Sequence, residues 1–207
     1  MCPCSFVKGK DTSTLKYEIG VNTYTVQEAL FNFWSPSTFH YYNTLPGLRF
    51  KLHQNNYSLR ASFDHVSNSY HLRDTNPLNY QSITGSSQMN VVRIGFEKTM
   101  IEGPLAIYTA ADMVYANAHY KGNDQGHGDF NPGWNYDYTL TAKAIGLSPA
   151  IGIKYRPFKH WSIGLETQLN LMYYKVNYQG QSAYKESGMA LLLNPLGSLS
   201  LNYHFNR

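Results

Sequence analysis

Residues 161–171 read Trp-Ser-Ile-Gly-Leu-Glu-Thr-Gln-Leu-Asn-Leu, with apolar side chains at almost every second position. Neighbouring side chains of an extended strand point to opposite faces, so this alternation is typical of a strand with one apolar and one polar face. Glu166 lies in the middle of the polar face, which therefore carries charge as well as hydrogen-bonding groups. The stretch predicts a β-strand that separates two different environments.

The same alternation recurs along the whole chain and predicts eight strands. Tight turns are expected at 54–56, 102–104 and 156–160, and long polar, aromatic-rich loops near 25–45, 68–88, 119–138 and 176–190. Short turns at one rim and long loops at the other are typical of an up-and-down membrane barrel, with periplasmic turns and extracellular loops. The expected strands lie within 15–23, 48–52, 57–65, 92–96, 105–115, 145–155, 161–173 and 197–205.

Charge separates the two faces of these strands. The forty positions on the apolar face contain no Asp, Glu, Lys or Arg, whereas the interleaved positions contain eleven of them. Because unpaired charges are costly in a low-dielectric interior, six cations and five anions together predict a paired network inside a narrow lumen. The residues of this predicted network are Lys16, Glu18, Arg49, Lys51, Arg60, Asp64, Arg93, Glu97, Asp112, Lys154 and Glu166.

A soluble barrel with its apolar face turned inward shows the same alternation and is the alternative. Glycines on the charged face favour the membrane barrel, because a tight lumen needs small residues and a solvent surface does not. Aromatic rings near the strand ends at the short-turn rim also favour it, since they suit a membrane–water boundary. The glycines are Gly20, Gly95, Gly152 and Gly164, and the rings are Tyr17, Phe50, Tyr57, Phe96, Tyr155, Trp161, Tyr203 and Phe205.

Composition excludes several classes of protein. A mean hydropathy of −0.41, without a long apolar run, excludes a membrane-spanning helix. The net charge of +4 includes no basic run, so no nucleic-acid partner is expected. Cys2 and Cys4 complete no zinc pattern, and we expect neither a metal nor a cofactor. We interpret residues 1–14 as an N-terminal segment, the remainder of a signal peptide, and 15–207 as one barrel domain.

Two segments carry a resemblance to a known group. Residues 146–158, continued by 161–165, resemble a strand–turn–strand of small Gram-negative outer-membrane β-barrel proteins, and 199–205 resemble the last-strand signal of that group. The resemblance implies a location in the cell outer membrane and contact with outer-membrane lipid or lipopolysaccharide. The resemblance says little about activity. Our own prediction is a structural or accessory role, in which the long extracellular loops bind a protein partner or ligand.

A shorter string suggests an enzyme instead. His65-Val66-Ser67-Asn68 resembles the motif of the outer-membrane lipid A 3-O-deacylase family, whose catalytic His and Ser face the lipid. The resemblance implies that Ser67 is the nucleophile and His65 the general base. Asp74 could orient His65 only if the loop 68–88 folded back over the wall. The motif lies in the third strand here but late in the barrel of that family, so the deacylase is the alternative function.

Three further interpretations concern the loops and the lumen. Asp124, His127 and Asp129 offer donors for a divalent cation, but their spacing matches neither a calcium loop nor a zinc site, and a solvated loop is expected. Because side chains fill the interior of an eight-stranded barrel, a general porin is not expected. The aromatic loop 25–45 could cover the barrel as a lid, bind a partner or glycan, or lie on the membrane; its rings are Phe31, Phe33, Trp34, Phe39, Tyr41 and Tyr42.

Overall fold

The computed structural model describes residues 15–26, 43–76, 79–128 and 131–205. None of these residues forms a helix long and apolar enough to cross a membrane. Residues 1–14 and the rings of the aromatic loop 25–45 lie outside the described part of the chain. The eight strands are β1 Lys16–Val26, β2 Asn43–Gln54, β3 Tyr57–Asn76, β4 Asn79–Ile101, β5 Leu105–Gly128, β6 Asn131–Tyr155, β7 Trp161–Gln179 and β8 Tyr184–Phe205.

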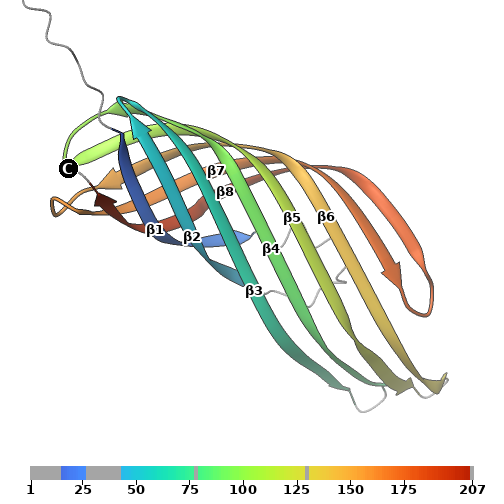
Figure 1. The fold of residues 1–207 in the computed structure, drawn as a ribbon. Helices are drawn as coiled ribbons and strands as arrows, with labels where there is room; N and C mark the ends of the chain where they lie inside the picture. Colours follow the sequence, from blue (N-terminus) through green and yellow to red (C-terminus); the bar gives the residue numbers. More distant parts are fainter. Residues whose placement is uncertain (1–14, 27–42, 77–78, 129–130, 206–207) are drawn as a thin grey trace, which may run out of the picture.

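Each strand pairs antiparallel with its neighbours in the chain, and the sheet closes into a barrel (Figure 1). Closure occurs between β1 and β8, with Tyr17 opposite Phe205 at one end of the pairing and Tyr24 opposite Ser198 at the other. Closure removes the unpaired edges that a flat sheet of eight strands would expose. The predicted antiparallel, up-and-down, eight-stranded β-barrel is confirmed.

Apolar side chains cover the outside of the barrel in the segment next to the short turns. Burial alternates residue by residue along β7, where Leu165 is 46% exposed and Glu166 only 2%. Leu201 of β8, opposite Ile163 of β7, also faces outward. We call this outer surface, which runs on β7 from Trp161 to Tyr173, the apolar belt. The soluble alternative is wrong, because an apolar surface of this extent requires a lipid environment.

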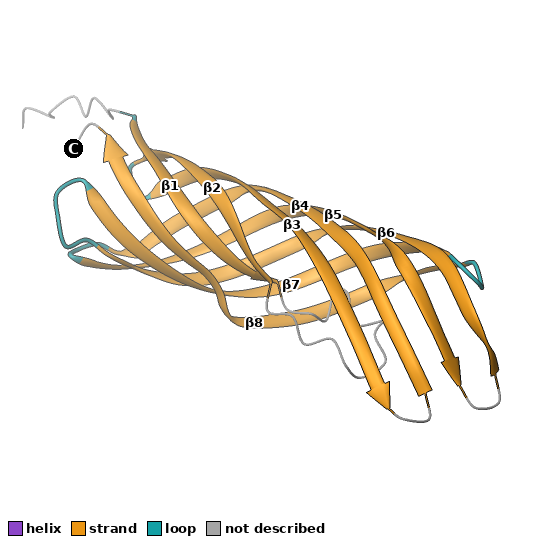
Figure 2. Ribbon diagram, turned by 90° about the horizontal axis from the view of Figure 1, so that it is seen from below, coloured by secondary structure: helices purple, strands orange, loops and turns teal. Residues whose placement is uncertain are grey.

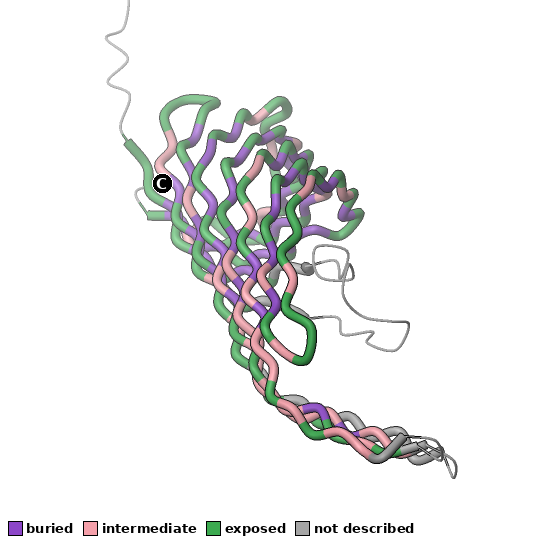
Figure 3. The backbone as a smooth tube through the Cα atoms, turned by 90° about the vertical axis from the view of Figure 1, so that its right-hand side faces the viewer, coloured by how far each residue is buried: buried purple, intermediate pink, exposed green. Residues whose placement is uncertain are grey.

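From the upper part of the apolar belt onward, the interior changes from charged to apolar, and above the belt the outer face becomes polar. Inside β5, charged Asp112 is followed by Val114, Ala116 and Ala118, all buried in one hydrophobic cluster. On the outer face of β5, the side chains beyond Tyr115 are polar. Figure 3 shows buried and exposed positions alternating along the barrel wall, whereas the far strand extension is mostly of intermediate burial. The cluster comprises Met89, Val91, Val114, Ala116, Ala118, Leu140, Ala142, Met172, Tyr174, Val176, Tyr178 and Ala190.

Turns at the rim near the chain ends are short, as predicted. Asn55 adopts a positive φ of 55° in the turn between β2 and β3, a conformation that Asn tolerates better than most residues. The backbone N–H of Thr99 donates to the carbonyl of Asn56 at 2.8 Å, and that of His204 donates to His160 at 2.8 Å. These hydrogen bonds tie each turn to a neighbouring strand at this rim.

The opposite rim differs from the prediction. Residues expected to form loops at 68–88 and 119–138 instead extend β3 to β6, with Asn76 opposite Asn79 and Gly128 opposite Asn131. Figure 2 shows these four strands continuing past the ends of β1 and β2. The predicted loop 176–190 likewise shrinks to a turn around 180–183. The prediction was wrong because these segments are polar and lie in polar surroundings, so no apolar–polar alternation marks them as strands. Backbone hydrogen bonds to the neighbouring strands nevertheless hold them extended.

Candidate functional site

The middle of the lumen brings together predicted charges from four strands. Arg60 of β3 donates to both oxygens of Asp112 on β5, at 2.7 and 2.5 Å, and to Glu166 Oε1 of β7 at 3.0 Å. Arg49 of β2 donates to the same Glu166 oxygen at 2.7 Å and to Ser198 at 3.2 Å. Two carboxylates thus oppose two guanidinium groups, which offsets the desolvation of all four.

Two lysines and two glutamates form a second group nearer the short turns. Lys51 Nζ lies 2.5 Å from Glu97 Oε2, and Lys154 Nζ lies 2.9 Å from Glu18 Oε2. The crossed pairs are longer, at 3.6 Å between Lys51 and Glu18 and 3.5 Å between Lys154 and Glu97. Each ammonium group therefore lies between two carboxylates, and the four strands β1, β2, β4 and β6 are linked through their side chains.

Tyr108 of β5 fills the space between these two groups. Its hydroxyl donates to Glu166 at 2.9 Å, and its ring centroid lies 5.1 Å from Lys51 Nζ and 5.7 Å from Lys154 Nζ. A Cβ on Gly152 would collide with the Tyr108 ring, so the glycine leaves the space that this ring occupies. Sequence reasoning placed this glycine on the charged face but did not identify Tyr108 as the group that needs it.

A third group continues the network toward the upper lumen. Asp64 accepts from Asn22 Nδ2 at 2.6 Å and lies 3.5 Å from Arg93 NH1. Lys16 does not join the network, because it is exposed at the first position of β1. The structure buries the other ten predicted charges, five cations and five anions: Arg49, Lys51, Arg60, Arg93, Lys154, Glu18, Asp64, Glu97, Asp112 and Glu166.

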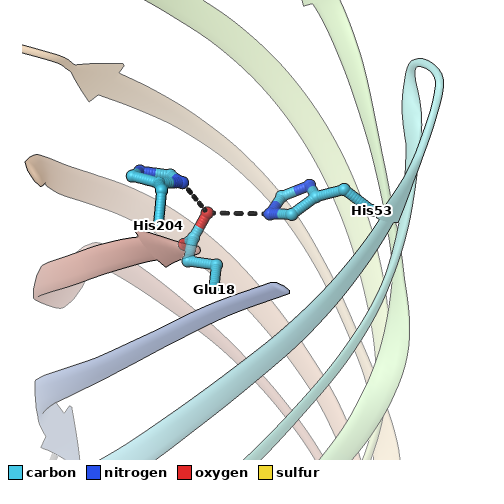
Figure 4. A group of neighbouring side chains, drawn as sticks. All are labelled: Glu18, His53 and His204. Carbon is cyan, nitrogen blue, oxygen red and sulfur yellow. Dashed lines mark hydrogen bonds and ion pairs between the residues drawn. The ribbon is translucent and has the colours of Figure 1, made fainter. Parts of the chain in front are cut away.

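A cluster that the sequence analysis missed lies at the short-turn end of the lumen (Figure 4). Glu18 Oε2 is 2.9 Å from His53 Nε2 and 3.3 Å from His204 Nδ1, and the carboxylate accepts while the ring nitrogens donate. Ser58 Oγ lies 2.6 Å from His53 Nδ1 and Ser162 Oγ 2.8 Å from His204 Nε2. Both histidines occupy lumen positions of their strands, so the alternation could have found them.

The donors of this cluster are close enough together to hold a metal ion, but its electrostatics oppose one. The ligand atoms of the two histidines and the carboxylate lie within 4.8 Å of one another. The oxygen that would bind a cation already accepts from the Lys154 ammonium group, at 2.9 Å. A divalent ion would face that positive charge at contact distance, so the arrangement is better suited to closing the lumen with hydrogen bonds.

His65 and Ser67 both lie exposed on the outer face of β3, just above Phe63 of the apolar belt. His65 Nδ1 is 2.8 Å from Asn90 Oδ1 on β4, the residue directly opposite. Ser67 lies opposite Gln88, and within the described side chains no hydrogen bond joins it to His65. The structure therefore orients the imidazole with an amide, while the predicted nucleophile and base remain apart.

Asp74 does not take the position that the deacylase interpretation required. β3 continues as an extended strand to Asn76, so Asp74 lies nine residues beyond His65, about 30 Å along the strand. The expectation of a loop that folds back is wrong, because this segment pairs with β4. Asn68 belongs to the same strand, and its side chain lies outside the described part of the structure.

Asp124, weighed above as a cation ligand, organises the upper sheet instead. Its carboxylate accepts from Trp134 Nε1 and Tyr136 OH, both at 3.0 Å, and from Gln81 Nε2 at 3.2 Å. Burial, together with this hydrogen bond to Asp124, raises the pKa of Tyr136 to about 12. His127 stacks on Tyr80, with ring centroids 5.7 Å apart, and Asp129 lies outside the described residues. The Asp124 carboxylate on β5 thus already accepts hydrogen bonds from its two neighbouring strands, β4 and β6.

Comparison with known proteins finds similarity in structure rather than in sequence. No protein-family model matches the chain, and no curated protein matches it. A major outer membrane protein from Thermus thermophilus is 10% identical and superimposes with a TM-score of 0.51, over 93% of this chain and all of that one.

Two further solved structures match most of this chain with lower scores. Ail, the attachment invasion locus protein of Yersinia pestis, is 14% identical, with a TM-score of 0.38 over 92% of this chain and 97% of that one. CarO2 of Acinetobacter baumannii is 13% identical, with a TM-score of 0.43 over 91% and 98%. At these identities a likeness shows the fold alone, and the likeness to the Thermus protein supports that of a small outer-membrane β-barrel.

Proposed function

We propose that this chain is a plugged barrel of the outer membrane with a structural or accessory role. The observation that carries this proposal is the network of ten buried charges, which fills the lumen from Glu18 to Asp64. A channel needs a water-filled interior, whereas here side chains from opposite walls meet through ion pairs. Removing such a plug would expose several charges at once, so the network favours a lumen that stays closed.

The upper sheet of β3 to β6 supports an accessory role in which an extracellular surface binds a protein partner or ligand. The apolar cluster of β4 to β8 lies next to this sheet, and the sheet has internal hydrogen bonds, such as that from Asn123 Nδ2 to Asn135 Oδ1 at 2.7 Å. Because these interactions hold its shape, the polar outer surface is available for recognition. For the apolar belt, the expected contacts are outer-membrane lipid or lipopolysaccharide.

Planar-bilayer recording tests the plugged lumen. The refolded whole chain should produce no large, steady conductance at neutral pH, because the charge network leaves no continuous water path. A large, steady conductance would overturn the proposal. A pull-down of the tagged chain from solubilised outer membranes tests the accessory role, for which we expect a stoichiometric partner. Repeated failure to recover one, with the barrel shown to be folded, would contradict that role.

One observation favours a second candidate, the lipid A deacylase. His65 is oriented by Asn90 at 2.8 Å, an amide that can hold an imidazole in the tautomer that leaves its other nitrogen free to act as a base. Ser67 is exposed two residues away on the same lipid-facing wall. In this candidate His65 takes the hydroxyl proton as Ser67 attacks an ester carbonyl of an outer-leaflet lipid; the C–O bond breaks and the alcohol leaves with that proton, and water then releases the acyl group from Ser67 as a fatty acid. Asn90 takes the orienting role first considered for Asp74.

Mass spectrometry of lipid A separates the two candidates. If the enzyme exists, cells that express the wild-type chain lose an acyl group from lipid A, and Ser67→Ala cells do not. Ser69→Ala is the matched control, since Ser69 is exposed on the same face of β3. Identical lipid A from the wild type, Ser67→Ala and an empty vector would eliminate the deacylase and leave the accessory barrel.

A further inference from the structure

Three lysines lie together on the outer wall, immediately above the apolar belt. Lys143 of β6 is directly opposite Lys175 of β7, and Lys185 of β8 is opposite Asn177, two residues further along β7. All three lysines are exposed, and they line one shallow pocket of about 400 Å³. We call these residues the lysine cluster. Thr141, Asn177 and Ser187 add hydroxyl and amide groups to the same pocket.

The charges of this cluster are not balanced by the protein. Like charges on directly opposite residues of a sheet destabilise it. In the lumen, the opposite cations Lys51 and Arg60 share the counter-charge of Glu97, at 2.5 and 3.5 Å. Within the described residues, no carboxylate forms an ion pair with Lys143, Lys175 or Lys185. Glu186 lines the same pocket but accepts a hydrogen bond from the Tyr174 hydroxyl at 3.1 Å. Three ammonium groups share a pocket with one carboxylate, so the pocket keeps a net positive charge and matches an anionic ligand.

The height of the cluster identifies the source of that ligand. Tyr173, the last belt residue of β7, lies two residues below Lys175, and its ring centroid is 5.8 Å from the Lys175 ammonium. Ile145 and Met189 lie below the cluster on β6 and β8, with 49% and 69% of their surface exposed. Cationic groups thus lie directly above an apolar wall. A phosphorylated lipid of the outer leaflet has the same order, with its acyl chains beside the apolar wall and its phosphates at the level of the lysines.

We propose that the lysine cluster binds the phosphate-bearing headgroup of an outer-leaflet lipid, whose acyl chains lie on the apolar belt below it. A phosphate monoester carries about −1.5 to −2 charges near neutral pH and three acceptor oxygens, which suits several ammonium donors. Thr141, Asn177 and Ser187 offer further donors to the headgroup. This inference deepens the lipid contact proposed above and rests on the placement of the belt in the membrane.

Native mass spectrometry of the detergent-solubilised whole chain tests the site. The probes are bisphosphorylated lipid A, the same lipid A without its phosphates, and inorganic phosphate. The triple variant K143Q/K175Q/K185Q is compared with K16Q/K98Q/K159Q, which removes the same charge from exposed lysines near the short turns. Each lysine contributes appreciably at an anionic lipid surface, so the first variant should bind lipid A at least ~10-fold more weakly than the wild type, and the control within about 2-fold.

Several outcomes would overturn the inference. Equal binding of lipid A with and without phosphates would show that acyl chains alone dominate. Equal losses in both triple variants would show that net charge rather than the cluster matters. Competition by millimolar inorganic phosphate would indicate a site for free anions. If the triple variant fails to fold, Lys175→Gln, the central lysine of the cluster, provides the comparison, with an expected loss of about 3-fold.

The outcomes also distinguish this site from the proposed function. A closed lumen in planar bilayers with no preference for phosphorylated lipid A would remove the lysine cluster and keep the plugged barrel. A conducting barrel that still loses lipid A binding in K143Q/K175Q/K185Q would remove the plug and keep the site. The two proposals therefore fail on separate measurements.

Discussion

The lower and upper halves of the barrel are built from the same strands with opposite polarity. In the lower half, β5 turns Asp112 inward and Met113 outward; only a few residues further, Val114 and Ala118 lie inside and Lys121 outside. The lower interior holds paired charges, and the upper interior holds an apolar cluster. The surrounding medium accounts for this exchange: hydrocarbon favours an apolar exterior, and water favours an apolar interior.

Removing one carboxylate from the lower interior should have the largest effect. Glu166→Gln leaves Arg49 and Arg60 without their shared counter-charge, and loss of one partner of a buried ion pair costs about 3–5 kcal/mol of the free energy of unfolding. Urea unfolding of the two proteins in lipid vesicles measures this loss in the free energy of unfolding. The matched change in the upper half, Glu186→Gln, should stay within about 0.5 kcal/mol because Glu186 is exposed. Equal effects would contradict the high cost of unpairing a charge that is buried in the lower interior.

Arginine substitutions at two positions on the outer face of β7 compare the barrel exterior within the apolar belt with the exterior above it. Leu165→Arg places a charge in the apolar belt and should cost about 2–4 kcal/mol, whereas Asn177→Arg, on the same face above the belt, should cost about 0–1 kcal/mol. Vesicle unfolding titrations of the two variants give the comparison. A cost for Asn177→Arg as large as that for Leu165→Arg would show that the belt does not end near Tyr173.

Truncation of the upper interior tests whether its apolar cluster stabilises the extension. Leu140→Ala removes a side chain that is only 7% exposed, and large-to-alanine changes in a core cost about 2 kcal/mol or more. Hydrogen exchange should become faster in the upper parts of β6 and β7, with little change near the short turns. Uniformly faster exchange over the whole barrel would contradict two separately stabilised halves.

The smallest effect concerns the pH dependence of the upper sheet. The pKa of Tyr136 rises to about 12 in the folded chain, against an ordinary value of 10.0, because of burial and the Asp124 carboxylate. A raised pKa stabilises the protonated form, so this contribution is complete below pH 10 and disappears as the pH rises to about 12. Absorbance titration at alkaline pH, wild type minus Tyr136→Phe, should show this late ionisation. A difference curve centred near pH 10 would contradict the Asp124 contact.

The lower half could be predicted from the sequence because its two faces differ sharply. Alternation in 161–171 and the charges at Arg49 and Arg60 follow from strand geometry and from the hydrocarbon outside. Eight strands, their turns and the direction of the faces were therefore predictable. Individual ion pairs were not, because the partner of Arg60 on a strand across the lumen depends on barrel dimensions that no local pattern encodes.

The upper half was not predicted from the sequence because its alternation of apolar and polar side chains is weak, and because its apolar side chains face inward rather than outward. Residues such as Gly122 and Asn123 carry the polar composition of a loop, yet they pair with β4 and β6. A bulge in β8 opposite Thr167 was also missed, although Pro195, which lacks the backbone N–H that a ladder needs, marks it. The lysine cluster needed the register of β6, β7 and β8, since Lys143 and Lys185 are far apart in sequence.

Spin-label accessibility along the outer face of β7 tests the exchange of polarity most directly. With Cys2 and Cys4 replaced by Ser, single labels at Leu165, Leu171 and Lys175 are placed in the refolded barrel in lipid vesicles. We predict high accessibility to lipid-soluble oxygen at the first two positions and to a water-soluble nickel reagent at the third, with the change near Tyr173. Preference for the nickel reagent at Leu165, or the same preference at all three positions, would contradict the account.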